Sequence, residues 1–390
     1  MRNFLVLIIS LVLITLVGCA HIPSPDNPNI GDRLKIVEVN QLLNSKEQGV
    51  NLIESNLSNL ELSNMNFKGA QLASSFMYRT DFSNSSLEGA DLRGTDLRHA
   101  KLHNVNLRNA NLSGADLRNV SIVNSDLSGA NLSNADLSDA TISRSVFKMT
   151  NMGNVVFKFT TISESLFESS HLQNSDFTGA KVEGADFKYA TILNAKLVKT
   201  QFLNSIFQAA SFSSSHLSHS EFTNCNFNDA DLSYTLASEV NFTKSDLQGS
   251  VLKHADLAGA IFNVANLSYT DLSHAIFKEA QMKHTNLSNS ILINTDLSYS
   301  NLDNASFVKA KLDQVNFEQS QLTNVNFFKA SVISSNMFKA DLTRANFQEA
   351  DLRLSIFTEA DIEDANFILV KNFDKTVGMS ETKHTDSAKF

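Results

Sequence analysis

Few residues in this sequence have a type and spacing that could support catalysis or metal binding. There are 2 cysteines, Cys19 and Cys225, and 10 histidines. The cysteines lie too far apart in the sequence to have metal-ligand spacing, and no Ser/His/Asp arrangement, phosphate-binding loop or HExxH motif is present. We therefore expect no catalytic residue, no metal site and no cofactor.

Cys19 has the clearest chemical setting. It follows an apolar run from Phe4 to Val17, which is too short for a comfortable membrane span and is typical of a secretory signal. Leu16, Val17, Gly18 and Cys19 resemble the bacterial lipobox. This resemblance implies cleavage before Cys19 and acylation of its thiol and new amino group. An ordinary signal peptide, or an anchor helix with an incidental cysteine, is the alternative interpretation.

The segment after Cys19 has the composition of a tether. All 3 prolines of the protein, Pro23, Pro25 and Pro28, fall in it, and proline extends neither a helix nor a central strand. We interpret 1–18 as a signal peptide and 19–33 as the lipidated cysteine and its tether. Ala20 after the cysteine resembles the pattern that sorts lipoproteins to the outer membrane of the bacterial cell envelope.

A five-residue repeat dominates the rest of the chain. From Leu52 to Phe367 every fifth residue is Leu, Phe, Ile, Val or Met, and Ala237 is the single exception. The residue two places before each of these centres is nearly always small, and the residue between them is often Asp or Asn, as in Ala130-Asn131-Leu132. The repeat has no proline and no break in register, so it predicts one continuous structure.

Neither a helix nor a flat strand can bury this pattern. Five residues advance a helix by about 500°, which spreads the apolar positions around its axis, and an odd period sends successive side chains of a strand to opposite faces. A core forms if the chain turns a corner once per five residues. Four pentapeptides then close a square coil, and stacked coils pair as parallel ladders about 4.8 Å apart.

These residues resemble the pentapeptide-repeat family, whose motif is A(D/N)LXX. The resemblance implies an all-β fold, a right-handed quadrilateral parallel β-helix, here over residues 50–370 with about 16 coils at the ladder spacing. Residues 34–49 are expected to form a short amphipathic helix that caps the first coil. Residues 371–390 are polar and are expected to be a flexible tail.

Side chains spaced by twenty residues should stack in columns along such a rod. One column contains Tyr234, His254 and His274, which could form a weak surface metal or anion site or could simply be exposed rings. Another column contains five consecutive Phe centres, beginning at Phe147. Cys225 falls at an inward position, where it is either a small core residue or a reactive thiol.

Two sets of outward positions could be binding surfaces. The first set, here the basic set, could face anionic lipid or could be solvated, and it consists of Arg79, Arg93, Arg98, His99, Lys101, Arg108 and Arg118. The second set, here the apolar set, could be a self-association or partner surface, could pack under the tail, or could have no role. It consists of Val308, Phe328, Ile333, Phe338, Leu354 and Ile368.

The sequence favours a non-enzymatic, lipid-anchored envelope protein whose rigid rod binds or spaces a protein or cell-wall partner. The membrane is its partner through the lipid, and a homodimer through the C-terminal coils is a further expectation. The net charge of −9 has the wrong sign for binding nucleic acid. The alternative is a DNA mimic that binds a type II topoisomerase, an activity that the family resemblance implies, but a secretory signal and an uninterrupted register count against it.

Overall fold

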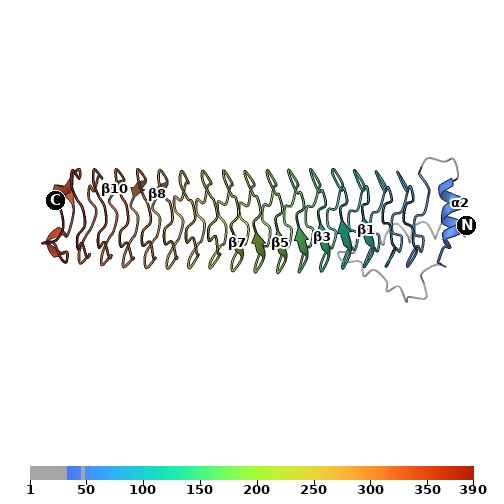
Figure 1. Cartoon of the computed structure of the whole chain (residues 1–390), viewed down its shortest axis with the longest axis horizontal. Helices are drawn as coiled ribbons and strands as arrows, with labels where there is room; N and C mark the ends of the chain where they lie inside the picture. Colours follow the sequence, from blue (N-terminus) through green and yellow to red (C-terminus); the bar gives the residue numbers. More distant parts are fainter. Residues whose placement is uncertain (1–32, 45–48) are drawn as a thin grey trace, which may run out of the picture.

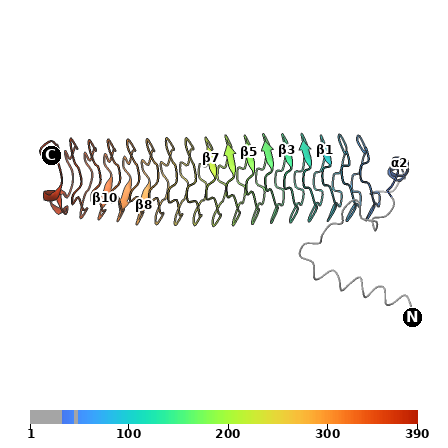
Figure 2. The same cartoon turned by 90° about the horizontal axis from the view of Figure 1, so that it is seen from below.

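The computed structural model describes residues 33–44 and 49–390 of the chain. Coils of chain stack along one axis to form a long rod, with helix α2 (Ile36–Asn44) at one end and the C-terminus at the other (Figures 1 and 2). The family resemblance predicted an all-β parallel solenoid, and this prediction is confirmed.

Parallel backbone pairing joins each coil to the next. Bridges connect residues twenty apart throughout the repeat, from Asn51 with Gln71 to Asn346 with Asn366. Where the pairing is most regular it forms parallel sheets in the orders β1–β7 and β10-β9-β8. The strands are β1 Lys101–His103, β2 Ser121–Val123, β3 Thr141–Ser143, β4 Thr161–Ser163, β5 Lys181–Glu183, β6 Gln201–Leu203, β7 Glu221–Thr223, β8 Ile291–Ile293, β9 Lys311–Asp313 and β10 Ser331–Ile333.

The repeat centres form one continuous core along the axis. Every centre from Leu52 to Phe367 is buried, including the exceptional Ala237. The column that begins at Phe147 stacks through Phe227 with ring centroids 4.6 to 5.1 Å apart. The predicted core positions and their twenty-residue turn are therefore confirmed, and each buried ring contributes roughly 1.5–3 kcal/mol before ordering entropy is subtracted.

The corners of each coil rest on a left-handed backbone conformation. The second residue after each centre has a positive φ, as in Asn84 at 61° and Tyr189 at 58°. This region costs non-glycine residues about 1–2 kcal/mol, which explains why Asn and Gly are common there. The same residue's N–H donates to the next coil, and for Asn84 the acceptor is the carbonyl of His103 at 2.8 Å.

Small polar side chains satisfy the backbone groups that the ladder leaves free. The Asp or Asn before each centre accepts a hydrogen bond from the N–H after that centre, as Asn131 Oδ1 does from Ser133 N at 3.1 Å. At inward positions Ser and Thr donate to buried carbonyls, as Ser125 Oγ does to Leu102 O at 2.7 Å. The recurrent Asp and Asn are thus mainly structural, because an unpaired amide at each corner would cost stability.

Helix α2 covers the first coil, as predicted. It is shorter than the predicted 34–49, and its apolar residue Val39 is fully buried against the core. The N–H of Leu34 donates to Asn56 O at 2.9 Å, which ties the residues before the helix to the first coil.

The prediction of a flexible tail over residues 371–390 was wrong. These residues form a last coil in which Lys371, Val377, Lys383 and Lys389 pair in parallel with the coil before them. Its sides are six residues long and contain the 3-10 helices η2 (Phe373–Lys375) and η3 (Met379–Glu381). A six-residue spacing does not match the five-residue repeat, so the repeat predicted an end to the solenoid one coil too early. The rings of Phe373 and Phe390 lie 5.7 and 5.5 Å from that of Phe367 and cover the end of the core.

We expect Leu132→Asp to lower the free energy of unfolding by several kcal/mol, because it places an unpaired charge in the fully buried centre of a coil. Asn134→Asp is the matched control, since it adds the same charge two residues later at an exposed, left-handed corner. Urea unfolding followed by circular dichroism measures both. Equal stability of the two variants would contradict the inward assignment of Leu132.

We expect Phe373→Ala to lower the free energy of unfolding by about 1–2 kcal/mol, because its half-buried ring packs on the end of the core. Phe159→Ala removes the same ring from an exposed corner and should change stability by less than about 0.5 kcal/mol. Thermal unfolding compares the two variants. If Phe373→Ala were neutral, the last coil would not stabilise the rod.

Candidate functional site

Aspartates neutralise most of the basic set. Arg93 pairs with Asp91 at 2.7 Å, and Lys101 and Arg108 pair with aspartates of neighbouring coils. Arg98 pairs with Asp96 at 2.7 Å and also lies 3.6 Å from Asp116. Arg118 continues this chain of charges from Asp116 to Asp136.

The remaining members of the basic set, Arg79 and His99, surround one aromatic ring. The Arg79 guanidinium lies 5.1 Å from the centre of the Tyr78 ring, and the His99 ring meets the same ring edge-on at 5.4 Å. Arg98 also approaches this ring, at 5.7 Å. Ion pairs thus offset the positive charge of Arg93, Arg98, Lys101, Arg108 and Arg118, and contact of the basic set with an anionic surface stays a prediction.

A local sequence signal could have revealed the pairing. The side chains of an Asp before a centre and an Arg after it project from the same side of the coil and can pair, as in Asp91-Leu92-Arg93. The hydrogen bond from Arg93 lowers the pKa of the Asp91 carboxyl, although burial acts in the opposite direction. The hydrogen bond with Asp116 likewise raises the pKa of the Arg118 guanidinium.

The apolar set does not form one patch. Val308, Phe328 and Ile368 share a corner by the twenty-residue register, whereas Phe338 lies half a coil away and Ile333 and Leu354 lie on a third corner. Each of the two phenylalanine rings has a lysine ammonium close to it, at 4.7 Å for Phe328 and 4.8 Å for Phe338.

The predicted apolar cluster was therefore wrong as a single surface, because residues ten apart lie on opposite sides of a square coil. Packing of the set under the tail is also not observed, because Leu354 and Ile368, in the coil next to residues 371–390, stay 55% and 39% exposed. Association of two copies through the C-terminal coils stays a prediction.

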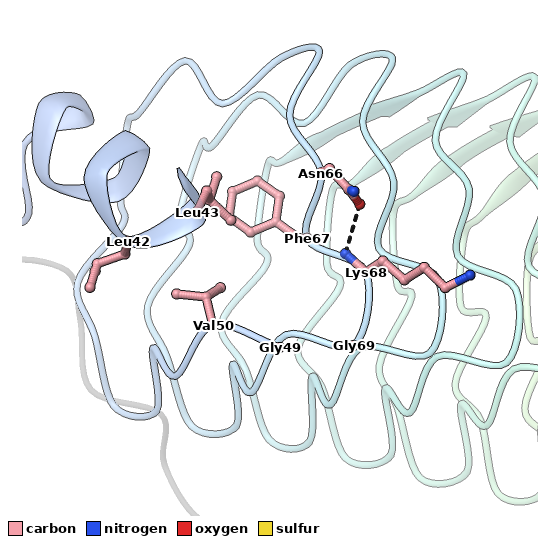
Figure 3. Close-up of a pocket in the computed structure, with 8 residues that line it drawn as sticks. All are labelled: Leu42, Leu43, Gly49, Val50, Asn66, Phe67, Lys68 and Gly69. Carbon is pink, nitrogen blue, oxygen red and sulfur yellow. Dashed lines mark hydrogen bonds between the residues drawn. The ribbon is translucent and has the colours of Figure 1, made fainter. Parts of the chain in front are cut away.

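A cavity that the sequence did not predict lies between helix α2 and the first coils. Its volume is about 580 Å³. The Leu43 side chain lies beside the Phe67 ring, and Lys68 extends away along the rod (Figure 3). The Lys68 ammonium pairs with Glu88 at 3.2 Å. The lining combines apolar side chains with the polar residues Asn66 and Lys68, and it contains no acid–base pair. The lining residues are Leu42, Leu43, Gly49, Val50, Asn66, Phe67, Lys68 and Gly69.

The predicted ring column is present. The Tyr234 and His254 rings stack at 4.8 Å, and the His254 and His274 rings stack at 4.7 Å. No group of three or more His, Cys, Asp or Glu residues suited to a metal ion occurs within residues 33–44 and 49–390. Cys225 is 2% exposed, and burial raises the pKa of its thiol to about 12, which makes it a core residue rather than a nucleophile.

Cys19, the predicted lipidation site, lies outside the described residues, as do the signal peptide and nearly all of the tether. In the part of the chain that is described, no helix combines the length and hydrophobicity needed to cross a bilayer.

Two protein-family models match the chain. The model for pentapeptide repeats matches in 8 copies, over residues 48–84, 77–114, 225–263, 265–292, 290–327 and 335–371. The model for a pentapeptide repeat region matches residues 120–197. No curated protein matches the sequence.

Several solved structures are similar to the chain. HetL, a pentapeptide repeat protein involved in heterocyst differentiation regulation from the cyanobacterium Nostoc sp., is 24% identical over 65% of this chain and 97% of its own, with a TM-score of 0.23. A trypsin-treated variant of QnrB1, a plasmid-mediated fluoroquinolone resistance protein, is 17% identical over 60% of this chain and 92% of its own, with a TM-score of 0.27. A thylakoid-lumen pentapeptide repeat protein of Arabidopsis thaliana is 24% identical over 30% of this chain and 67% of its own, with a TM-score of 0.20.

We expect Asp91→Asn to reduce stability at neutral pH but not at low pH. The pKa of Asp91 is lowered in the fold, so its charge stabilises the protein above the ordinary value of 3.8, and this contribution disappears as the pH falls through the folded pKa. Asparagine keeps the corner hydrogen bond, so the substitution removes the charge alone. Urea midpoints at pH 7, 5, 3 and 2 measure the difference.

The control for this experiment is Asp139→Asn, at an exposed corner where the aspartate has no ion pair within residues 33–44 and 49–390. A difference between Asp91→Asn and wild type that persists unchanged at pH 2 would show that the ion pair with Arg93 does not stabilise the fold.

Proposed function

The chain belongs to the pentapeptide-repeat family, and we propose that it is a non-enzymatic, lipid-anchored protein of the bacterial cell envelope. Its rod binds or spaces a protein or cell-wall partner, and acylated Cys19 holds the rod at the membrane, with the outer membrane as the expected location. We further propose that the coil is right-handed and that about 16 turns make a rod roughly 77 Å long.

The observation that carries this proposal is the unbroken ladder. Parallel pairing continues without a gap from the first coil to Asn366 and on into the last coil at Lys389. Such a ladder contains no hinge, because bending it would break hydrogen bonds on several sides of the coil at once. A stiff body that presents long flat sides is suited to binding or spacing.

The charge arrangement supports this function over DNA mimicry. A mimic of DNA needs a surface of uncompensated negative charge, whereas Asp91, Asp96 and Asp116 are each paired with an arginine near the proposed anchor. Lysines pair in the same way with Glu349 and Glu359 near the other end.

Metabolic labelling with a palmitate analogue, followed by membrane fractionation, tests the anchor. We expect label in the wild-type protein and none in Cys19→Ala, because the acylated thiol is absent. Cys225→Ala is the matched control, since it removes the other cysteine at an inward position where alanine is common, and it should keep the label. Density-gradient separation of the membranes then distinguishes the inner from the outer membrane.

An unlabelled, cytoplasmic wild-type protein would overturn the envelope function. In that case binding to a type II topoisomerase would become the leading hypothesis, and inhibition of DNA supercoiling would be the assay to perform.

A further inference from the structure

A second surface hollow lies on one corner of the rod, far from the proposed anchor. Its volume is about 300 Å³, at the lower end of the range for small-molecule sites. All of its lining side chains are polar or absent. They are Gln208, Asn228, Asp229, Gln248, Gly249 and Tyr269.

The hollow exists because Gly249 interrupts a column of side chains. Residues at one position in successive coils stack in this fold, as the Tyr234 and His254 rings do at 4.8 Å. Tyr269 follows Gly249 in its column, so the face of its ring on that side has no neighbour to stack on. The ring is 61% exposed. A Cβ on Gly249 would lie 2.5 Å from Asp229 Oδ1, which shows that the carboxylate of the preceding coil leans into the vacant position.

Three amides form the adjoining wall. Gln208, Asn228 and Gln248 occupy one position in three successive coils, and each amide offers both donors and an acceptor. The buried Oδ1 of Asn228 has no hydrogen-bond partner among the described residues. Rotation of this oxygen toward a ligand would therefore cost no existing hydrogen bond, while it would satisfy a buried acceptor.

Few charged side chains lie close to the hollow. Besides Asp229 they are Asp246, which accepts a hydrogen bond from the Gln248 N–H at 3.2 Å, and Lys188, which precedes Gln208 in the amide column and lies 3.8 Å from Asp186. By the twenty-residue register, the amide column continues as Ser268 and Ser288, and in the neighbouring column only Asp229 carries a charge between Tyr189 and Asn289. Tyr189 is 56% exposed and lies four coils before Tyr269, about 19 Å away at the ladder spacing. The corner thus has an aromatic ring at each end of a strip of amides.

We propose that this corner binds an uncharged glycan chain. Sugar hydroxyls both donate and accept, which suits amides beside one carboxylate, and the apolar face of a sugar ring suits the unstacked face of Tyr269. The negative charge of Asp229 disfavours phosphate and nucleic acid. The inference rests on the proposed function in one respect, since it assigns the cell-wall partner of the rod to the glycan class.

The test uses the full chain in detergent micelles and two soluble probes, hexamers of β-1,4-linked N-acetylglucosamine and of β-1,4-linked glucose. Saturation-transfer NMR measures binding, and the two probes distinguish N-acetylated from plain glycans. We expect wild type to bind at least one of them. Gly249→Asn fills the hollow and Tyr269→Ala removes the ring, and each should weaken binding at least tenfold.

Matched controls separate the site from the fold. Gly129→Asn makes the same change elsewhere in the same column, and a Cβ there would also lie 2.5 Å from a side-chain oxygen, Oδ1 of Asn109. Tyr299→Ala removes an exposed ring from another corner. Both should bind like wild type. Asparagine is common at left-handed corners, so both glycine variants should fold, and circular dichroism checks this.

Binding of neither hexamer by wild type, or unchanged binding by Gly249→Asn, would overturn the glycan site. The palmitate experiment is independent of this result. A labelled protein that binds no glycan would refute the present inference while it leaves the anchored rod intact.

Discussion

Hydrogen bonding between coils is the constraint on which the rest of the structure depends. The N–H of each centre donates to a carbonyl nineteen residues later, as Leu132 N does to Asn151 O at 2.7 Å. The chain must therefore return to the same place every twenty residues, with one corner every five. The left-handed residue at each corner, the small inward residue and the Asp or Asn that accepts a corner N–H all serve this closure.

Most of the core could be predicted from the sequence because the constraint repeats. The single large apolar residue on each side of a coil must point to the axis to be buried, so the burial of Leu132 and the stacking of Phe147 on Phe167 follow from spacing alone. The stacked rings of His254 and His274 were predictable for the same reason, although their position says nothing about a role.

The features that could not be predicted depend on neighbours rather than on period. The last coil escaped detection because its sides have six residues, and only contacts with Phe367 show that Phe373 belongs to the core. The pairing within the basic set could not be read from the positive residues alone, because Arg93, Arg98 and Arg118 meet the aspartate two residues before them while Arg108 meets Asp126 of the next coil. The corner hollow depends on which side chains lie above and below Gly249, namely Asp229 and Tyr269, and the repeat alone does not specify them.

The lysines of the last coil have a consequence for how the rod ends. An open parallel ladder is a template on which a further chain could grow, as in amyloid. Three of the four residues that pair this coil with the one before it are lysines, Lys371, Lys383 and Lys389. Another rod that tried to extend the ladder would have to stack its side chains on three ammonium groups, while helix α2 covers the opposite end. Charge repulsion and desolvation of these lysines would therefore oppose end-to-end growth of the ladder.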